Sequence, residues 1–150
     1  MTWKPHATVA VIVEDGKGRY LLVEERSQGK VVFNQPAGHI EEGEAVLDAA
    51  RREALEETGW QVEPAAFLGM YRYLSPGNGR TYFRFCFAAR AVSHVSDQLD
   101  DGIIAAHWFT LEQIRELGDQ LRSPLVLNCI LDYRKGRRFP LDVIVEPDAG

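Results

Sequence analysis

The hydrophobic and polar positions in the first forty residues follow a strand-like pattern. Residues 7–14 are β-branched and apolar on both faces, which is typical of a central strand. The polar turn 15–18 and the apolar segment 19–25 predict a returning strand, and therefore a hairpin. Residues 31–38 predict one further short strand that Pro36 interrupts, because proline cannot donate a ladder hydrogen bond.

The pattern then changes to a helical one. A helix is predicted to begin at Gly43-Glu44 and to run to about Thr58, where Gly59 occupies the usual position after a helix end. One stripe of this helix is apolar or small and is expected to face the core; it consists of Leu47, Ala50, Ala54 and Thr58.

The rest of the chain predicts three strands and two short helices. Strands are expected at 66–74, 81–92 and 103–109, and helices from Thr110 to about Leu117 and over about 124–134. The second strand should place alternate residues on opposite faces. Those residues are Phe83, Phe85 and Phe87 on one face, and Tyr82, Arg84 and Cys86 on the other.

The order β-β-β-α-β-β-β-α-α predicts one domain over residues 1–150, in which helices pack on a mixed sheet at the border between the α/β and α+β classes. A net charge of −5 disfavours non-specific nucleic-acid binding but allows a small anionic substrate if a metal ion inverts the local field. Cys86 and Cys129 are expected to be buried thiols in a reducing compartment. Neither a membrane-spanning segment nor a secretory signal is recognisable, so no membrane partner and a cytoplasmic location are expected.

The predicted central helix carries a cluster of acids. Glu53 and Glu57 lie one turn apart with Glu56 beside them, and the neighbouring residues Ala49 and Ala54 are small, so a ligand could approach there. A solvated helix face is the alternative, although like charges four residues apart cost roughly 0.2–0.5 kcal/mol per pair. Arg52 can pair with Glu56, whereas no basic residue occupies the helical positions next to Glu53 and Glu57. Such oxygen ligands suit Mg²⁺ or Mn²⁺.

Residues 38–60, GHIEEGEAVLDAARREALEETGW, resemble the Nudix box of the Nudix hydrolases. The matching positions are Gly38, Glu44, Arg52, Glu53, Glu56, Glu57 and Gly59, whereas Ala54 and Trp60 replace aliphatic residues. Outer segments including FNQPAGHIE, LDDGI, HWF and LRSPLV are similar to the NudJ-type phosphatase branch. The resemblance implies an α/β/α sandwich with a mixed central sheet.

The resemblance also implies roles for these residues. Glu53, Glu56, Glu57 and the Gly38 carbonyl would bind Mg²⁺, for which Mn²⁺ could substitute. Arg52 would hold a glutamate of the box, and Glu44 would brace the loop against the helix N-terminus. The implied reaction is hydrolysis of a phosphoanhydride in a nucleoside di- or triphosphate, or in hydroxymethylpyrimidine diphosphate, with Glu56 or Glu53 as the general base. Asp100 or Asp101 could assist, or both could be ordinary surface acids.

Substrate contacts follow from the strand pattern and the outer motifs. Arg84 and Tyr82 share a strand face and suit a phosphate and a stacked ring, with a surface Arg–Tyr pair as the alternative. Asn34, Gln35 and Arg122, together with His6 and Ser123, could line the pocket. Other residues are expected to have structural roles: His39 in a loop, the three tryptophans in packing, and the basic run 134–138 at an exposed helix end.

The expected partner is a small diphosphate or nucleotide, nucleic acid is not expected, and the chain would be a monomer or a homodimer. A Nudix domain that binds nucleotide or RNA without catalysis is the alternative function. Such domains usually lack box glutamates, and this sequence has all of them.

Overall fold

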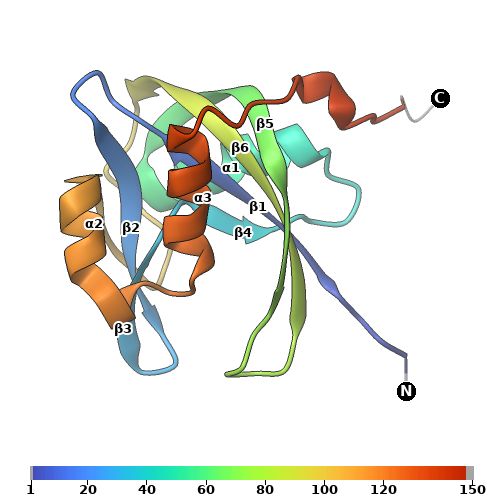
Figure 1. The fold of residues 1–150 in the computed structure, drawn as a ribbon, viewed down its shortest axis with the longest axis horizontal. Helices are drawn as coiled ribbons and strands as arrows, with labels where there is room; N and C mark the ends of the chain where they lie inside the picture. The colour runs from blue at the N-terminus through green and yellow to red at the C-terminus, as the bar shows by residue number, and fades with distance from the viewer. Residues whose placement is uncertain (1, 148–150) are drawn as a thin grey trace.

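The computed structural model describes residues 2–147 and arranges them as two β-sheets with helices packed on them (Figure 1). The elements in chain order are β1 (His6–Val13), β2 (Arg19–Ser27), β3 (Lys30–Asn34), β4 (Ala37–His39), α1 (Val46–Thr58), β5 (Trp60–Leu74), β6 (Thr81–His94), β7 (Ile103–Thr110), α2 (Leu111–Leu117), the 3-10 turn η1 (Gly118–Gln120), α3 (Leu125–Arg134) and the 3-10 turn η2 (Leu141–Val143).

The larger sheet is mixed. Its four strands lie in the order β4-β1-β6-β5, with β1 parallel to β6 and the other neighbours antiparallel. The smaller sheet is antiparallel, in the order β3-β2-β7. This arrangement confirms the predicted fold class. The order of strands along the chain did not indicate that they divide between two sheets.

Apolar side chains fill both faces of the mixed sheet, which is why the molecule is layered. On one face Val11 and Phe87 pack with Ala50 and Ala54 of α1. On the other face buried side chains of β1 and β6 pack with the smaller sheet, α2 and α3. The sheet is thus enclosed between α1 and α3, as the figure shows (Figure 1).

The predicted strand over 31–38 is two strands, because Pro36 ends the pairing. β3 pairs with β2 in one sheet, and β4 pairs with β1 in the other. The carbonyl of Pro36 accepts the Val11 N–H at 3.1 Å, so the chain crosses between the sheets at this proline. The crossing brings Asn34 and Gln35 against Arg84 of the mixed sheet, and Gly38 against Glu53 of α1.

Helix α1 begins at Val46, three residues after the predicted Gly43. Gly43 has φ +77°, a left-handed conformation that a helix cannot contain. Glu44 closes this turn: its N–H donates to the Glu41 carbonyl and its Oε1 accepts the Glu41 N–H, both at 3.0 Å. The predicted end is confirmed, since Gly59 follows Thr58 with φ +75°.

Strand β5 begins at Trp60, six residues earlier than predicted. Shifts of register near Gln61, Pro64 and Phe67 interrupt its pairing with β6, so the alternation of apolar residues is lost there. Strand β6 shows the predicted division of faces, because Cys86 and Phe87 belong to the two different cores.

The C-terminal predictions hold with small changes. Thr110 and Gln113 form the predicted capping box at α2, and Pro124 precedes α3. The basic run is more tightly held than expected. The Nε of Arg137 donates to the Leu68 carbonyl at 2.7 Å, and Arg138 lies over the Tyr133 ring.

All three tryptophans pack against another aromatic ring, as predicted. Trp60 and Trp108 meet edge to face, with centroids 5.6 Å apart. Trp3 precedes β1 and is 67% exposed, but it meets the Phe83 ring edge to face with centroids 6.4 Å apart. Cys86 and Cys129 are buried free thiols. Within residues 2–147 no helix has the length and apolarity needed to cross a membrane.

Candidate active site

The acidic residues of α1 face the crossing between β3 and β4. Glu57 is buried, and its Oε1 accepts the Ala37 N–H at 2.8 Å. Glu53 packs against Gly38, where a Cβ would overlap the Glu53 carboxylate as it stands, so a larger residue here would displace that side chain. The small residues beside the acids, Ala49 and Ala54, are fully buried in the core between α1 and the mixed sheet. The expectation that they leave room for a ligand is therefore wrong.

Arg52 ties the loop and the acids together. Its guanidinium donates to Glu44 Oε2 at 2.7 Å, to Glu53 Oε1 at 2.7 Å and to Glu56 Oε2 at 3.2 Å. It also donates to the His39 carbonyl at 3.0 Å. Helical spacing alone gave Glu53 no basic partner, but the long side chain of its sequence neighbour reaches it. Glu44 contacts this guanidinium rather than the helix N-terminus, where Glu146 accepts the Val46 N–H.

Burial and mutual repulsion raise the pKa values of the three acids. Burial raises the pKa of Glu57 to about 9, and the charges of Glu53, Glu25 and Asp100 add to the effect. The pKa values of Glu53 and Glu56 are raised too, in both cases mainly by burial. Asp100 lies beside Glu56, and its N–H donates to the Glu56 carbonyl at 2.9 Å. No contact of this kind joins Asp101 to the described part of the cluster.

The donor set suits a hard divalent cation. Three carboxylates and the Gly38 carbonyl are oxygen ligands of the type that Mg²⁺ prefers, and a cation would relieve their repulsion. Over residues 2–147 no three acidic, histidine or cysteine side chains converge closely enough to hold a metal as they stand. Arg52 and the Ala37 N–H occupy the carboxylate oxygens instead. Rotation of the flexible glutamates is needed to bring them together.

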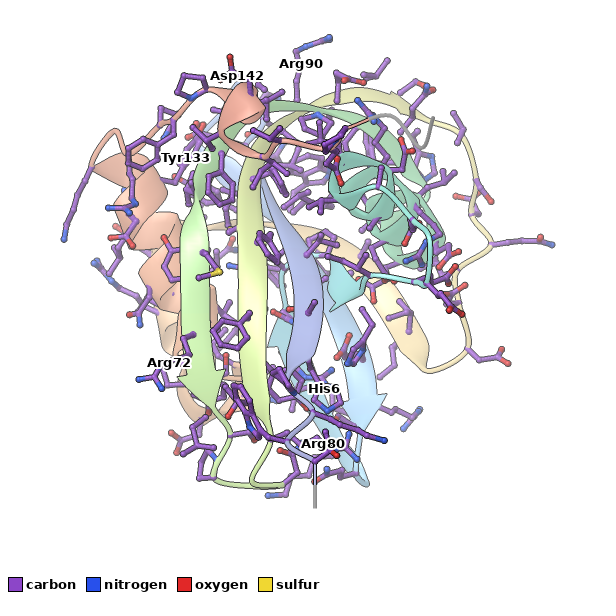
Figure 2. The ribbon with its side chains drawn as sticks, turned by 90° about the vertical axis from the view of Figure 1, so that its right-hand side faces the viewer. His6, Arg72, Arg80, Arg90, Tyr133 and Asp142 are labelled. Atoms are coloured by element: carbon purple, nitrogen blue, oxygen red, sulfur yellow. The ribbon has the colours of Figure 1, made fainter. Side chains whose placement is uncertain are left out.

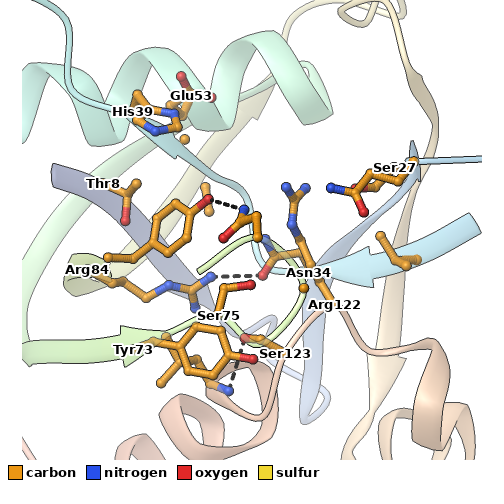
Figure 3. A pocket seen from close by; sticks show the side chains of 18 of the residues that line it. Thr8, Ser27, Asn34, His39, Glu53, Tyr73, Ser75, Arg84, Arg122 and Ser123 are labelled. Atoms are coloured by element: carbon orange, nitrogen blue, oxygen red, sulfur yellow. Dashed lines mark hydrogen bonds between the residues drawn. The ribbon is translucent and has the colours of Figure 1, made fainter. Parts of the chain in front are cut away.

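A cavity of about 660 Å³ opens beside the acids (Figure 3). Glu53, Glu57 and Gly38 line one end, whereas Glu56 does not reach it. Lys30, Arg84 and Arg122 contribute positive charge elsewhere in the lining. Several lining residues were not identified from the sequence because they come from separate elements: Thr8 of β1, Tyr73 of β5 and the hairpin tip 75–78.

Arg84 is buried, which excludes the surface Arg–Tyr pair. It is 6% exposed, and it donates to Gln35 Oε1 at 2.9 Å and to Asn34 Oδ1 at 3.0 Å. Asn34 lines the cavity with it. Gln35 lies behind Arg84, outside the lining, and its Nε2 donates to the Val126 carbonyl at 2.6 Å.

Aromatic rings form another wall of the cavity. Tyr82 accepts a hydrogen bond from Asn78 Nδ2 at 3.0 Å, and its ring lies 5.1 Å from the His6 ring. His39 is in β4 rather than a loop, and its Nε2 lies 2.9 Å from His6 Nδ1. Burial, followed by the charges of His6, Arg80 and Arg122, lowers the pKa of His39. His39 and Tyr82 line the cavity, whereas His6 supports them from behind.

The segment before α3 completes the lining. Arg122 and Ser123 both reach the cavity, and Arg122 is ion-paired with Glu25 of β2. The Arg122 N–H donates to the Phe33 carbonyl at 2.8 Å, which fixes this segment to β3. Thus the outer motifs, far apart in the sequence, meet around one cavity.

The chain belongs to the Nudix family: the NUDIX domain profile matches residues 4–129. It is 40% identical over 143 residues to Phosphatase NudJ of Escherichia coli strain K12, which covers 95% of this chain and 92% of that protein. A NUDIX hydrolase from Nitrosomonas europaea is 44% identical with a TM-score of 0.94, covering 98% of this chain and 100% of the other. A MutT protein from Methanosarcina mazei Go1 shares the fold at 21% identity and a TM-score of 0.73, over 92% of this chain and 99% of its own.

The chain is accordingly a Nudix hydrolase of the NudJ phosphatase type, an enzyme that acts on phosphoanhydrides. Nudix hydrolases generally use divalent metal ions and act on small nucleotide-like substrates. These properties agree with an acidic site that opens on a cavity lined partly by lysine and arginine side chains.

Proposed function

We propose that this enzyme hydrolyses, with Mg²⁺, a phosphoanhydride bond of a nucleoside di- or triphosphate or of a related diphosphate such as hydroxymethylpyrimidine diphosphate. The observation that carries the proposal is the acidic end of a cavity of nucleotide size: Glu53, Glu57 and Gly38 line it, and Arg52 joins the Glu56 carboxylate to that of Glu53. Basic side chains elsewhere in the lining of the same cavity suit the negative charge of such substrates.

In this proposal Glu53, Glu56, Glu57 and the Gly38 carbonyl hold Mg²⁺, and Mn²⁺ can replace it because it accepts the same oxygen ligands. The bound ion supplies charge neutralisation of the diphosphate and a lowered pKa for water. Arg52 keeps Glu53 and Glu56 in place while they are metal-free, and its bonds to Glu44 and the His39 carbonyl hold the loop against α1.

The reaction needs one attacking water and one proton acceptor. Water attacks phosphorus, a new P–O bond forms, and the bond from phosphorus to the bridging oxygen breaks. The proton of the water passes to a carboxylate of the acidic cluster, Glu53 or Glu56. The bridging oxygen leaves with the remaining phosphate.

The cavity wall binds the rest of the substrate. Arg84, Asn34 and Arg122 donate to phosphate or ring oxygens, and the Tyr82 ring packs against a planar ring. Gln35 acts through Arg84 as a positioning residue. We also propose a cytoplasmic location and a monomeric or dimeric enzyme.

A substrate panel at fixed Mg²⁺ tests the proposal. Nucleoside di- and triphosphates, ADP-ribose, thiamine diphosphate and hydroxymethylpyrimidine diphosphate are incubated separately, and orthophosphate and pyrophosphate are assayed independently. We expect Mg²⁺-dependent release from at least one diphosphate. Tight nucleotide binding without any release would favour the non-catalytic alternative instead.

A further inference from the structure

Arg84 carries a charge that no acid among residues 2–147 neutralises by an ion pair. Its guanidinium contacts three neutral groups: Gln35 Oε1, Asn34 Oδ1 and, at 3.9 Å, the Cys129 sulfur. Among the residues described, none of the ion pairs within 4.0 Å includes Arg84, although the residue is only 6% exposed. Burying a cation without an anionic partner is costly. An anion that binds beside such a cation removes this cost, so its binding is especially favourable.

The guanidinium is also fixed in position. Arg84 lies in β6 between Thr8 of β1 and Tyr71 of β5, so its backbone is held on both sides. The Gln35 amide is anchored to the Val126 carbonyl, which leaves its Oε1 for Arg84. An arginine has five N–H donors. Three are engaged by the neutral partners, and the others find no acceptor among the residues that the structure describes.

The fixed cation lies away from the acidic end of the cavity. In Figure 3 Thr8 lies between the side chains of Glu53 and His39 on one side and that of Arg84 on the other. Arg122 also lines this region, but Glu25 already neutralises it. The cavity therefore has negative side chains at one place and the Arg84 guanidinium at another. A diphosphate bound at the acids does not by itself explain why a cation is buried at the second place.

We propose that Arg84 binds a further phosphate group of the substrate, in addition to the diphosphate held at the acidic end. This inference rests on the proposed function and narrows its substrate class to phosphoanhydrides that carry an additional phosphate. The planar fork of arginine suits phosphate oxygens, and a bond between charged partners contributes more than one to a neutral ring carbonyl. The phosphate is either the end of a longer polyphosphate chain or a group elsewhere on the molecule.

Three substrates distinguish these sources: ADP, ATP and adenosine 3′-phosphate 5′-diphosphate. We would measure kcat/KM for each at fixed Mg²⁺ with the wild-type enzyme, Arg84→Gln, Arg84→Lys and the control Arg72→Gln. Arg72 is exposed on β5, points away from the sheet in Figure 2 and does not line the cavity. The Arg72→Gln variant therefore loses the same positive charge as Arg84→Gln but leaves the cavity unchanged.

The wild-type enzyme should favour ATP or the 3′-phosphorylated substrate over ADP by at least about tenfold, in keeping with a buried charge-assisted bond. Whichever is favoured identifies the source of the phosphate. Arg84→Gln should reduce this ratio to within about twofold of one. Arg84→Lys should reduce it at least about threefold, because an ammonium keeps the charge but loses the fork. Arg72→Gln should leave the ratio at the wild-type value.

Wild-type rates that do not depend on the additional phosphate would overturn the inference. So would an Arg84→Gln enzyme whose three rates fall in equal proportion. If Arg84→Gln does not fold, an unchanged ratio in Arg84→Lys overturns it equally well. No Mg²⁺-dependent release from any of the three, nor from the wider panel, would instead contradict the proposed function.

Discussion

At the scale of single residues, Glu57 is the most deeply buried acid of α1. Its carboxylate accepts the Ala37 N–H and lines the cavity, so a neutral isostere can keep the packing while it removes the charge. We expect Glu57→Gln to fold and to lower kcat at least about a hundredfold, as loss of a metal-site group does. Steady-state kinetics with Mg²⁺ measure this effect. Glu63→Gln, at an exposed ion pair with Arg51, is the control, and turnover by Glu57→Gln close to that of this control would contradict the role.

The raised pKa of Glu57 predicts a pH dependence of stability. Its pKa is about 9 in the folded protein against an ordinary value of 4.5, so folding favours the protonated carboxyl. This contribution is complete below pH 4.5 and is lost as the pH rises through about 9. Between pH 5 and pH 9 the metal-free protein should lose more than about 1.4 kcal/mol of unfolding free energy, the equivalent of one pKa unit.

Urea unfolding in a chelator at several pH values measures this loss. Glu57→Gln should flatten the dependence and leave the contributions of Glu53 and Glu56, which have the same sign, and of His39, whose lowered pKa has the opposite sign. Equal slopes for the two proteins would show that Glu57 is not the titrating group.

At the scale of elements, the end of α1 depends on Gly59. Its φ of +75° favours glycine, and a Cβ there would overlap the Ser96 carbonyl oxygen. Gly43 has a similar φ of +77° but open space around it, which makes it a matched control. Gly43→Ala should cost about 1 kcal/mol of unfolding free energy from backbone strain alone. Gly59→Ala should cost at least about 1 kcal/mol more. Equal melting temperatures for the two variants would contradict the overlap.

The elements were mostly predictable where one residue type sets the backbone. Gly59 ends α1, and Thr110 with Gln113 begins α2, as local rules require. The predictions were wrong at two boundaries, one decided by a contact distant in sequence and the other by the backbone conformation of one glycine. The start of β5 at Trp60 depends on pairing with β6, and the left-handed Gly43 delays the start of α1.

At the scale of the whole molecule, metal binding should stabilise the fold and release protons. If Glu57 is a metal ligand, as proposed, Mg²⁺ binds only its ionised form, so the Mg²⁺ affinity should rise with pH between 7 and 9. At a concentration a hundred times the Kd, Mg²⁺ should add about 2.7 kcal/mol to the unfolding free energy. The gain in melting temperature should be larger at pH 8.5 than at pH 6.5. A gain that does not change with pH would contradict the linkage.

The sequence by itself determined the fold class and the acidic cluster of this protein. Both follow from short-range rules: the periodicity of apolar residues, and the spacing that places Glu53, Glu56 and Glu57 on adjoining positions of one helix. Only the tertiary structure decided that Arg84 is buried, that Gln35 stands behind it, and that His39 meets His6. Burial and charge at these positions depend on which segments cross in space, and the crossing at Pro36 between two sheets is not encoded in any local pattern.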